Sequence, residues 1–376
     1  MPRDARPVYG WIGEWLPAPF AKRRLHTSDT VRNELFASLD LYANVRDFGD
    51  EILRKKGHTN LRASYGKLQA YLRQAKAFYE SAETLHFRAS PLNYYYAFMN
   101  YAKAVSLLRD PLFVDKKLRH GLMAGEAAHS LRKHRVGVQS SGVFPQFYQH
   151  ITGSNLAGGG KLSICALLGY VPDVQFEYGQ LKLGDLRSFP SRFAIATNKS
   201  RNEFHALIAI SHYNSPSFKS VEKVLNRDFE EVTVPEGTLR EVFDISAELR
   251  KAFRFFESRK IYAAPSDHID TPSIVADTVA ALKRVLSFNP QNDEFLFRLN
   301  SEFRTSRLVP MNEVLAIYCV MFHLGSLVRY RPNVLEAMLS KKDAWMIERF
   351  VKSSPLTFLK HIRNMIDDRY LVYSVR

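Results

Sequence analysis

The sequence predicts an α+β protein that is mainly helical, with a helical bundle as its core and a β-containing insertion in the middle of the chain. Three observations carry this prediction. Apolar residues recur at three- and four-residue steps early in the chain and again late in it, which is the period of a buried helix face. Over residues 137–270 glycine and proline become frequent, and short apolar runs lie between turn residues, as strands do. The 376 residues, 46% of them hydrophobic, supply a sizeable core and exclude a chain that is disordered throughout.

The same patterns divide the chain into four segments. Residues 1–30 are an aromatic N-terminal arm, which either lies across a groove of its own domain or docks on a partner. Residues 31–136 are a basic helical region, and residues 137–270 are a mixed α/β insertion. Residues 271–376 are a C-terminal helical region, which we expect to pack with residues 31–136.

Helices are expected wherever the apolar period of 3.6 residues persists. The tyrosine-rich helix that Pro91 starts after Ser90 is apolar on most sides, so it should be central and buried. The predicted helices are, in chain order, one from about Thr30, then Leu61–Phe87, Ser90–Leu108, His120–His134, Ser273–Leu286, Met311–Tyr330, Trp345–Val351 and Pro355–Asp368.

The middle of the chain predicts strands. Two short apolar runs, Arg192–Thr197 and Phe204–Ser211, predict a hairpin that turns across Asn198–Asn202. Further strands are expected at Glu230–Val234, Val242–Ile245 and Lys260–Ala263. The triple glycine Gly158–Gly160 precedes a short predicted helix, Leu162–Leu168. Because the spacing Gly-x4-Gly-Lys-Ser/Thr of a phosphate loop is absent, these glycines indicate a hinge rather than a nucleotide cradle.

The chain carries a surplus of positive charge. Its 53 Lys and Arg give a net charge of +15 against 38 Asp and Glu, and residues 1–135 alone hold 23 Lys and Arg against 13 Asp and Glu. The local clusters are Lys22-Arg23-Arg24, Arg54-Lys55-Lys56, Lys116-Lys117-x-Arg119 and Arg132-Lys133-x-Arg135. A field of this sign speeds encounters with polyanions, so we expect a nucleic-acid partner, RNA or DNA, or an acidic protein partner. A solvated basic face without a partner is the other interpretation.

Cysteine usage and hydropathy indicate a cytoplasmic protein with no membrane partner. Cys165 and Cys319 lie far apart in apolar surroundings, which is typical of reduced thiols rather than of a disulfide or a zinc site. No run reaches the ~18 apolar residues of a membrane span, and no signal peptide is recognised at the start. No cofactor or metal is expected, since metal-ligand spacing, Gly-x-Ser-x-Gly and Gly-x-Gly-x-x-Gly are all absent.

One family resemblance covers most of the chain from about residue 30. The stretch Ser90-Pro-Leu-Asn-Tyr-Tyr-Tyr-Ala-Phe-Met-Asn-Tyr-Ala-Lys-Ala104, followed by His120-Gly121-Leu122, resembles the YaaC-like family of bacterial proteins. Further pieces that are similar to segments of that family are Val136–Phe144, Leu162–Pro172 and His323–Pro332. The resemblance implies a bacterial protein. It says more about the fold than about the biochemical function.

A second, looser resemblance concerns the same helix. Tyr95-Tyr-Ala-x-x-Asn-x-Ala-Lys103 is similar to the first core helix of HEPN-type helical domains, many of which are ribonucleases or defence effectors. Those ribonucleases use Arg-x4-6-His, where His moves a proton of the 2′-hydroxyl and Arg stabilises charge on the phosphate. The nearest match, Arg201-Asn-Glu-Phe-His205, has three intervening residues and lies in the predicted hairpin, so a structural role is the alternative. His120 is the third catalytic candidate.

Five residues are candidates for ligand binding. Asn100 and Lys103 lie among aromatic residues of the tyrosine-rich helix, and with His120 they form either a structural hydrogen-bond cluster or a functional pocket. Arg329 and Arg331 end an apolar helix, where they either neutralise the helix dipole or grip a phosphate.

Two functions follow. The first is a non-catalytic component that binds nucleic acid or a partner protein, as a subunit of a complex or a homo-oligomer, in a phage-defence or stress system. The alternative is a HEPN-type ribonuclease effector that works without metal.

Overall fold

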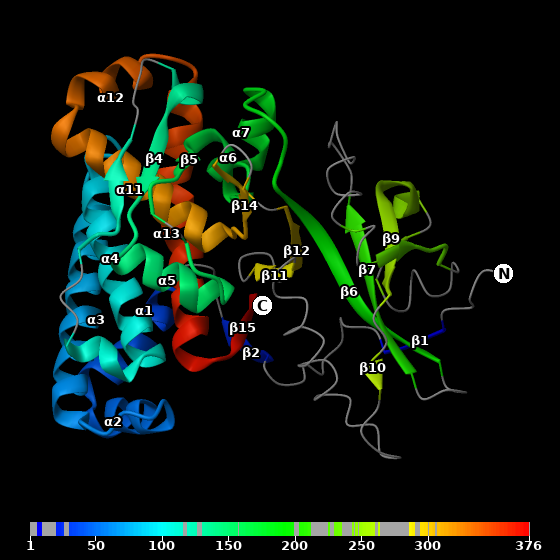
Figure 1. Cartoon of the computed structure of the whole chain (residues 1–376), viewed down its shortest axis with the longest axis horizontal. Coiled ribbons are helices and arrows are strands. Elements are labelled where there is room, and N and C mark those ends of the chain that lie inside the picture. The colour runs from blue at the N-terminus through cyan, green and yellow to red at the C-terminus, as the bar shows by residue number, and fades with distance from the viewer. Residues whose placement is uncertain are drawn as a thin grey trace. The chain divides into compact units, whose positions relative to one another are not determined.

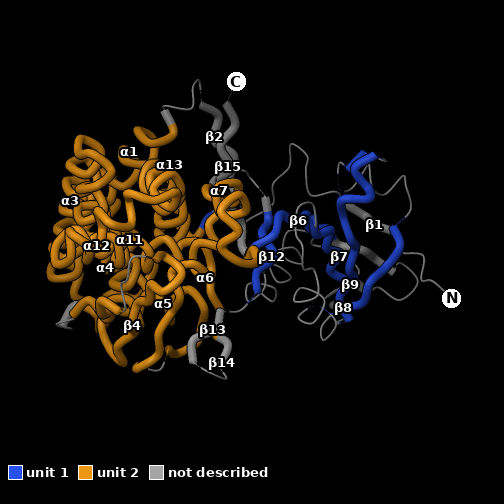
Figure 2. The backbone as a smooth tube through the Cα atoms, turned by 90° about the horizontal axis from the view of Figure 1, so that it is seen from above, with its two compact units in different colours: residues 1–24, 188–299, 369–374 blue, residues 25–187, 300–368, 375–376 orange. Residues whose placement is uncertain are grey.

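The computed structural model, shown in Figure 1, describes residues 6–9, 20–25, 30–115, 119–125, 130–156, 158–198, 203–211, 225, 229–234, 243, 245–246, 248–259, 262–263, 286–289, 294–299, 301–304 and 307–375. The chain divides into two compact units (Figure 2). Unit 1 comprises residues 1–24, 188–299 and 369–374, and unit 2 comprises residues 25–187, 300–368 and 375–376.

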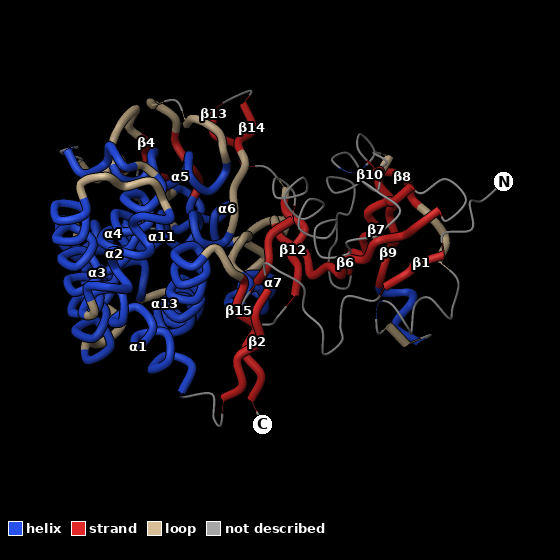
Figure 3. The backbone as a smooth tube through the Cα atoms, turned by 90° about the horizontal axis from the view of Figure 1, so that it is seen from below, coloured by secondary structure: helices blue, strands red, loops and turns tan. Residues whose placement is uncertain are grey.

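Unit 2 contains the α-helices whose bounds the structure describes, whereas most of the strands lie in unit 1, together with the 3-10 helix η4 (Glu248–Ala252) (Figure 3). The helices are α1 (Thr30–Asn44), α2 (Arg46–Lys55), α3 (Leu61–Thr84), α4 (Ser90–Arg109), α5 (Val143–Thr152), α6 (Ile164–Leu168), α7 (Gln175–Gln180), α11 (Glu313–Tyr330), α12 (Pro332–Leu339) and α13 (Asp343–Asp367). Short 3-10 helices lie at η1 (Pro111–Asp115), η2 (Leu131–Lys133) and η3 (Pro172–Val174). The fold is α+β and mainly helical, as the sequence predicts.

Helix α4 is the centre of unit 2, and α3, α5, α11 and α13 pack around it. Its prediction as a buried helix is confirmed, because most of its residues are inaccessible to solvent. Phe98 stacks on Phe358 of α13 with ring centroids 3.9 Å apart. Gly325 allows α11 to approach α4 closely, since a Cβ there would lie 3.2 Å from the carbonyl oxygen of Pro91. These contacts fix the relative positions of the helices that carry the site described below.

Helix α11 confirms the predicted apolar helix. Among the described residues it is the one helix long and apolar enough to cross a membrane, but 78% of its apolar window is buried inside the protein. The core helix of a soluble protein has the same properties, and α11 packs on α4, α6, α12 and α13.

The C-terminal helix differs from the prediction of two helices. Helix α13 is continuous and contains Pro355 in its interior. A proline in a helix removes one hydrogen bond and costs about 3 kcal/mol. Apolar residues are buried on both sides of it, among them Phe350, Val351, Phe358 and Leu359, and their packing keeps the helix intact.

The prediction of a helix over His120–His134 is wrong. The segment instead contributes β3 (Leu122–Ala124), which pairs antiparallel with β4 (Arg135–Val138), and β4 pairs in turn with β5 (Lys161–Ser163). Gly121 has φ of +80°, a conformation that breaks a helix. The predicted helix over residues 162–168 likewise begins later, at Ile164, where the side chain of Ser163 accepts a hydrogen bond from the backbone N–H of Ala166.

Unit 1 is built on an antiparallel sheet in the order β11-β12-β6-β7-β9-β8, with β1 paired to β6 and β10 paired to β7. Its strands are β1 (Arg6–Tyr9), β6 (Ser188–Asn198), β7 (Glu203–Ser211), β8 (Phe229–Glu231), β9 (Phe253–Ser258), β10 (Tyr262–Ala263), β11 (Leu286–Asn289) and β12 (Glu294–Arg298). The predicted hairpin is confirmed, because β6 pairs antiparallel with β7. Two further two-stranded sheets join β13 (Ser301–Arg304) to β14 (Arg307–Val309) and β2 (Phe20–Leu25) to β15 (Tyr370–Val375).

Several predicted features lie outside the described residues. They are most of the arm over residues 1–30, the pair Lys116-Lys117, most of the strand Val242–Ile245, and the helix Ser273–Leu286 apart from its last residue. The division of the chain into the four segments 1–30, 31–136, 137–270 and 271–376 remains a prediction from the sequence.

Candidate functional site

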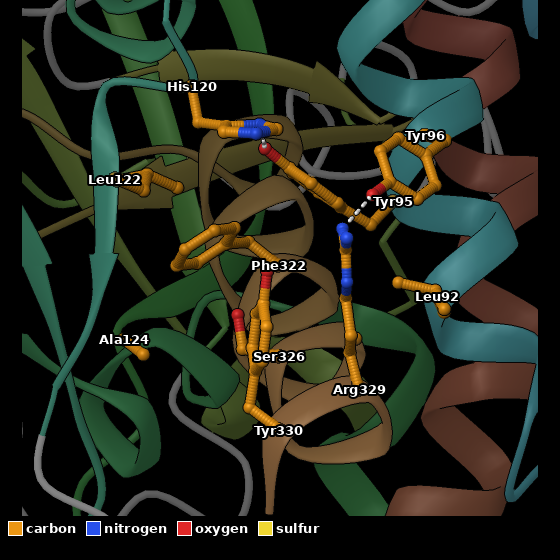
Figure 4. A pocket seen from close by; sticks show the side chains of 11 residues that line it. Leu92, Tyr95, Tyr96, His120, Leu122, Ala124, Phe322, Ser326, Arg329 and Tyr330 are labelled. Carbon is orange, nitrogen blue, oxygen red and sulfur yellow. Dashed lines mark hydrogen bonds between the residues drawn. The ribbon is translucent and has the colours of Figure 1, made fainter.

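A pocket opens in unit 2 between the first half of α4, strand β3 and the last turns of α11, with a volume of about 210 Å³ (Figure 4). Its apolar lining includes Leu92, Leu122, Ala124 and Phe322. Its polar lining consists of Tyr95, Tyr96, His120, Ser326, Arg329 and Tyr330. No carboxylate lies among the described residues that line the pocket, and its titratable side chains are those of Arg329, His120 and three tyrosines.

Tyr95 and His120 form a hydrogen-bonded pair at one side of the pocket. The phenol oxygen lies 2.6 Å from Nδ1 of His120, while the tyrosine ring is only 4% exposed and packs edge-on against Phe322. Burial raises the pKa of Tyr95 well above its usual value. Burial also lowers the pKa of His120, and the positive charges of Lys103 and Arg329 lower it further. The phenol therefore keeps its proton and the imidazole stays neutral at pH 7.

Arg329 lies on the other side of the pocket, on the last turn of α11. Its Nη1 donates a hydrogen bond of 2.6 Å to the hydroxyl of Tyr96, as the dashed line in Figure 4 marks. The guanidinium also lies 5.1 Å from the ring centroid of Tyr330, which is 66% exposed. The tyrosine fixes the position of the arginine, so a cation and an open aromatic ring lie together at the pocket mouth.

The other predicted binding residues lie around this pocket without lining it. Asn100 is buried, and its Nδ2 donates to the carbonyl of Tyr96, one turn earlier in α4. Lys103 lies over the ring of Tyr71 at 5.6 Å, and burial lowers its pKa. Arg331 is exposed just beyond the end of α11. The structure thus brings His120 and Arg329 into the pocket and leaves the other three outside it.

Of the three predicted catalytic residues, the structure describes His205 and His120, each in a different unit. His205 is buried in β7 of unit 1, with Nδ1 3.2 Å from the carbonyl oxygen of Ser258. Arg201 lies outside the described residues, and His120 belongs to unit 2.

Sequence reasoning missed a buried histidine pair, one member of which, His323, follows the pocket-lining Phe322 on α11. Nδ1 of His134, at the end of η2, is 2.8 Å from Nε2 of His323 on α11, and the two residues are 0% and 1% exposed. Burial, then the charges of His134 and Arg331, lower the pKa of His323 from 6.5 to about 3. The contact joins two residues that are 189 positions apart in the sequence, so no local sequence pattern predicts it.

Sequence reasoning also missed the tyrosines of the pocket. Tyr95, Tyr96 and Tyr330 were assigned to helix faces or left without a role, although Tyr95 and Tyr96 stand inside the stretch that carries the family resemblance. A signal was therefore present, but an aromatic residue at helical spacing predicts core packing first.

Six cations neighbour the pocket or the histidine pair along the chain. We call Arg119, Arg132, Lys133, Arg135, Arg329 and Arg331 the basic rim, because each neighbours one of these two features along the chain. Within the described part of the chain, none of these six side chains has a carboxylate partner. Those of Arg132 and Arg135 donate to backbone carbonyls, which leaves their charge uncompensated.

The fold and the site define a class: a mainly helical α+β protein with an aromatic, cation-bearing pocket against its central tyrosine-rich helix. Among the described residues no three His, Cys, Asp or Glu gather as a metal site would need. The family model described as "YaaC-like Protein" matches residues 43–366. The chain therefore belongs to the YaaC-like protein family, which confirms the predicted resemblance. Comparison with curated proteins and with solved structures gave no match.

Proposed function

We propose that this YaaC-like chain is a non-catalytic component that binds nucleic acid through the pocket mouth and the basic rim of unit 2. The observation that carries the proposal is the pairing, at one mouth, of a positioned guanidinium and an open aromatic ring. Arg329 is held by Tyr96 beside the exposed ring of Tyr330, and no carboxylate lies among the described residues that line the pocket.

Nucleic acid offers a partner to both the guanidinium of Arg329 and the aromatic ring of Tyr330. Arginine binds phosphate oxygens through parallel N–H donors, and uncompensated cations release counterions when they meet a polyanion. An exposed tyrosine offers a base a stacking surface worth about 1–3 kcal/mol. An acidic protein satisfies the cations but has no base for Tyr330, so we favour nucleic acid over the acidic partner.

The place of this activity is a further part of the proposal. We place the protein in the bacterial cytoplasm, as a subunit of a complex or a homo-oligomer, within a phage-defence or stress system. The HEPN-type ribonuclease is the alternative, and the binding experiment below also detects it.

The experiment measures the fluorescence anisotropy of a labelled 20-nucleotide single-stranded RNA of mixed sequence. If all six rim cations meet phosphates, affinity falls about 300-fold between 50 and 200 mM salt. Arg329→Gln and Tyr330→Ala should each weaken binding about tenfold.

Matched controls exist for both variants. Arg62→Gln removes an exposed arginine from the first turn of α3. That turn lies by the far end of α4, since His58, just before it, bonds the carbonyl of Leu107, about 18 Å along the helix from Tyr95. Phe176→Ala removes an equally exposed ring, 67% accessible, from α7. Neither control should change affinity by more than twofold.

Three results would overturn the proposal. The first is no binding at 50 mM salt. The second is stronger binding of polyglutamate than of RNA, which would favour the acidic partner. The third is RNA cleavage without metal that His120→Ala abolishes, which would establish the ribonuclease.

A further inference from the structure

We propose that the pocket takes up one unpaired base of the bound strand, so that the protein recognises single-stranded nucleic acid rather than duplex. This inference rests on the proposed function, because the basic rim must hold the strand before a base can enter. It names the form of nucleic acid that the site selects.

The size of the pocket sets the first limit. Pockets for drug-sized ligands and cofactors usually enclose roughly 300–1,000 Å³. The volume here is about 210 Å³, which suits one ring system and excludes a whole dinucleotide. Aliphatic and aromatic side chains, Leu92, Leu122 and Phe322 among them, form its walls, as a flat apolar ring face requires.

The polar groups inside suit the edge of a base. Tyr95 occupies Nδ1 of His120, and Nε2 of that imidazole has no hydrogen-bond partner among the described residues. The hydroxyl of Ser326 lies at another side of the pocket (Figure 4). A neutral imidazole and a hydroxyl donate or accept, and base edges carry both kinds of group.

Two residues at the mouth of the pocket, Arg329 and Tyr330, suit the parts of the strand that follow the inserted base. Arg329 lines the pocket, where it would meet the phosphate that follows an inserted base, and Tyr330, 66% exposed with the guanidinium over one face of its ring, would stack the next base on the other face. One inserted base would therefore fill the pocket, the following phosphate would bind Arg329, and the next base would stack on Tyr330.

Duplex disfavours this mode of binding. A paired base must be unpaired and unstacked before it can leave the helix, which costs a few kcal/mol. A base in a single strand, in a loop or at an end loses much less pairing and stacking free energy. The pocket should therefore give single strands an advantage that the basic rim alone does not give.

The test fills the pocket without changing any charge. Ala124 lies in β3 and lines the pocket at an exposed position, so Ala124→Phe places a ring in the base site with little risk to the fold. Met123, the preceding residue of the strand, is 46% exposed and does not line the pocket, as the alternation of side chains along a strand requires. Met123→Phe is therefore the matched control.

Affinities are measured for a 12-nucleotide single-stranded RNA with a central 2-aminopurine and for the duplex of the same sequence. The unaltered protein should bind the single strand at least tenfold more tightly, with a change in 2-aminopurine fluorescence. In Ala124→Phe, the ratio of single-strand affinity to duplex affinity should fall to about one, and the change in 2-aminopurine fluorescence should vanish. The affinity for the duplex and the salt dependence of that affinity should not change. Met123→Phe should behave like the unaltered protein.

The outcomes separate the two proposals. Equal affinity of the unaltered protein for single strand and duplex, or an unchanged preference in Ala124→Phe, would refute base uptake and leave nucleic-acid binding standing. Binding of neither probe at 50 mM salt would refute both. A circular dichroism spectrum of each variant that matches that of the unaltered protein confirms that the fold is retained.

Discussion

The contact between His134 and His323 should make the stability of unit 2 depend on pH in a defined window. Burial and neighbouring positive charge lower the pKa of His323 from 6.5 to about 3. The unfolded chain therefore takes up a proton at this residue below about pH 6.5, whereas the folded protein does not until about pH 3. The stability contributed by the neutral imidazole is complete above pH 6.5 and is lost as the pH falls toward 3.

The magnitude follows from the two pKa values. Between pH 7 and pH 5 the unfolded-state imidazole goes from mostly neutral to mostly protonated, while the folded-state imidazole stays neutral. Linkage then gives a loss of about 2 kcal/mol in the free energy of unfolding over this interval from His323 alone. Because His323 is 1% exposed, solvent does not screen this effect.

The perturbation is His323→Asn, which removes the titrating group and keeps a polar side chain opposite His134. Urea unfolding is followed by circular dichroism at 222 nm, which reports the helices of unit 2, at pH 7, 6 and 5 and constant ionic strength. The variant should be less stable at pH 7 by about 1–3 kcal/mol, since a buried hydrogen-bond partner is altered. It should also lose about 2 kcal/mol less than the unaltered protein between pH 7 and pH 5.

His86→Asn is the control, because His86 is exposed and its loss leaves the buried pair in place. The pKa of His58 is also lowered, chiefly by burial, but His58 is present in all three proteins and cancels in the comparison. Parallel pH profiles for the unaltered protein and His323→Asn would refute the reasoning, because they would mean that His323 takes up its proton equally in both states.

Two further predictions concern the core and the pocket. Phe98→Ala should lower the free energy of unfolding by about 3–5 kcal/mol in the same urea assay, since Phe98 is 0% exposed and stacks on Phe358; a loss below about 1 kcal/mol would contradict this packing. Arg329→Met should raise the pKa of His120, followed by proton NMR of its imidazole, because it removes one of the positive charges that lower that pKa; an unchanged or lower pKa would place the guanidinium away from the imidazole.

Long, strongly periodic segments were predictable from the sequence because their local pattern and their burial agree. The helices α4 and α11 are of this kind, since apolar residues on nearly every side require a position at the centre. The errors arose where longer-range packing outweighs a local rule. At Pro355 the buried residues on either side keep α13 intact, and at Gly121 one backbone conformation redirects a helix-like pattern into a strand.

The site was predictable only in part, for the same reason. His120 was identifiable from its place after the tyrosine-rich helix and Arg329 from its place at the end of an apolar helix, and the structure places both in one pocket. Their partners Tyr95 and Tyr96 belong to an apolar periodic helix, where aromatic residues predict packing first. The contact of His134 with His323 depends on how a strand hairpin lies against α11, which no local spacing encodes.

Charge clusters along the sequence identified four of the six cations of the basic rim, and pairing in three dimensions shows which other cations already meet carboxylates. Residues 1–135 carry the larger surplus, yet many of the cations of α1, α2 and α3 meet carboxylates, as in Arg32–Glu83, Lys55–Glu51 and Lys76–Asp40. Exposed pairs of this kind add only about 0–1 kcal/mol to stability, but each cancels the charge that a polyanion would meet. The six cations of the basic rim belong to the part of the surplus that the described carboxylates leave uncompensated, as do Arg54 and Arg62. For a polyanion bound as we propose, removing rim cations should weaken binding more than removing equally exposed cations that already have carboxylate partners, such as Lys55.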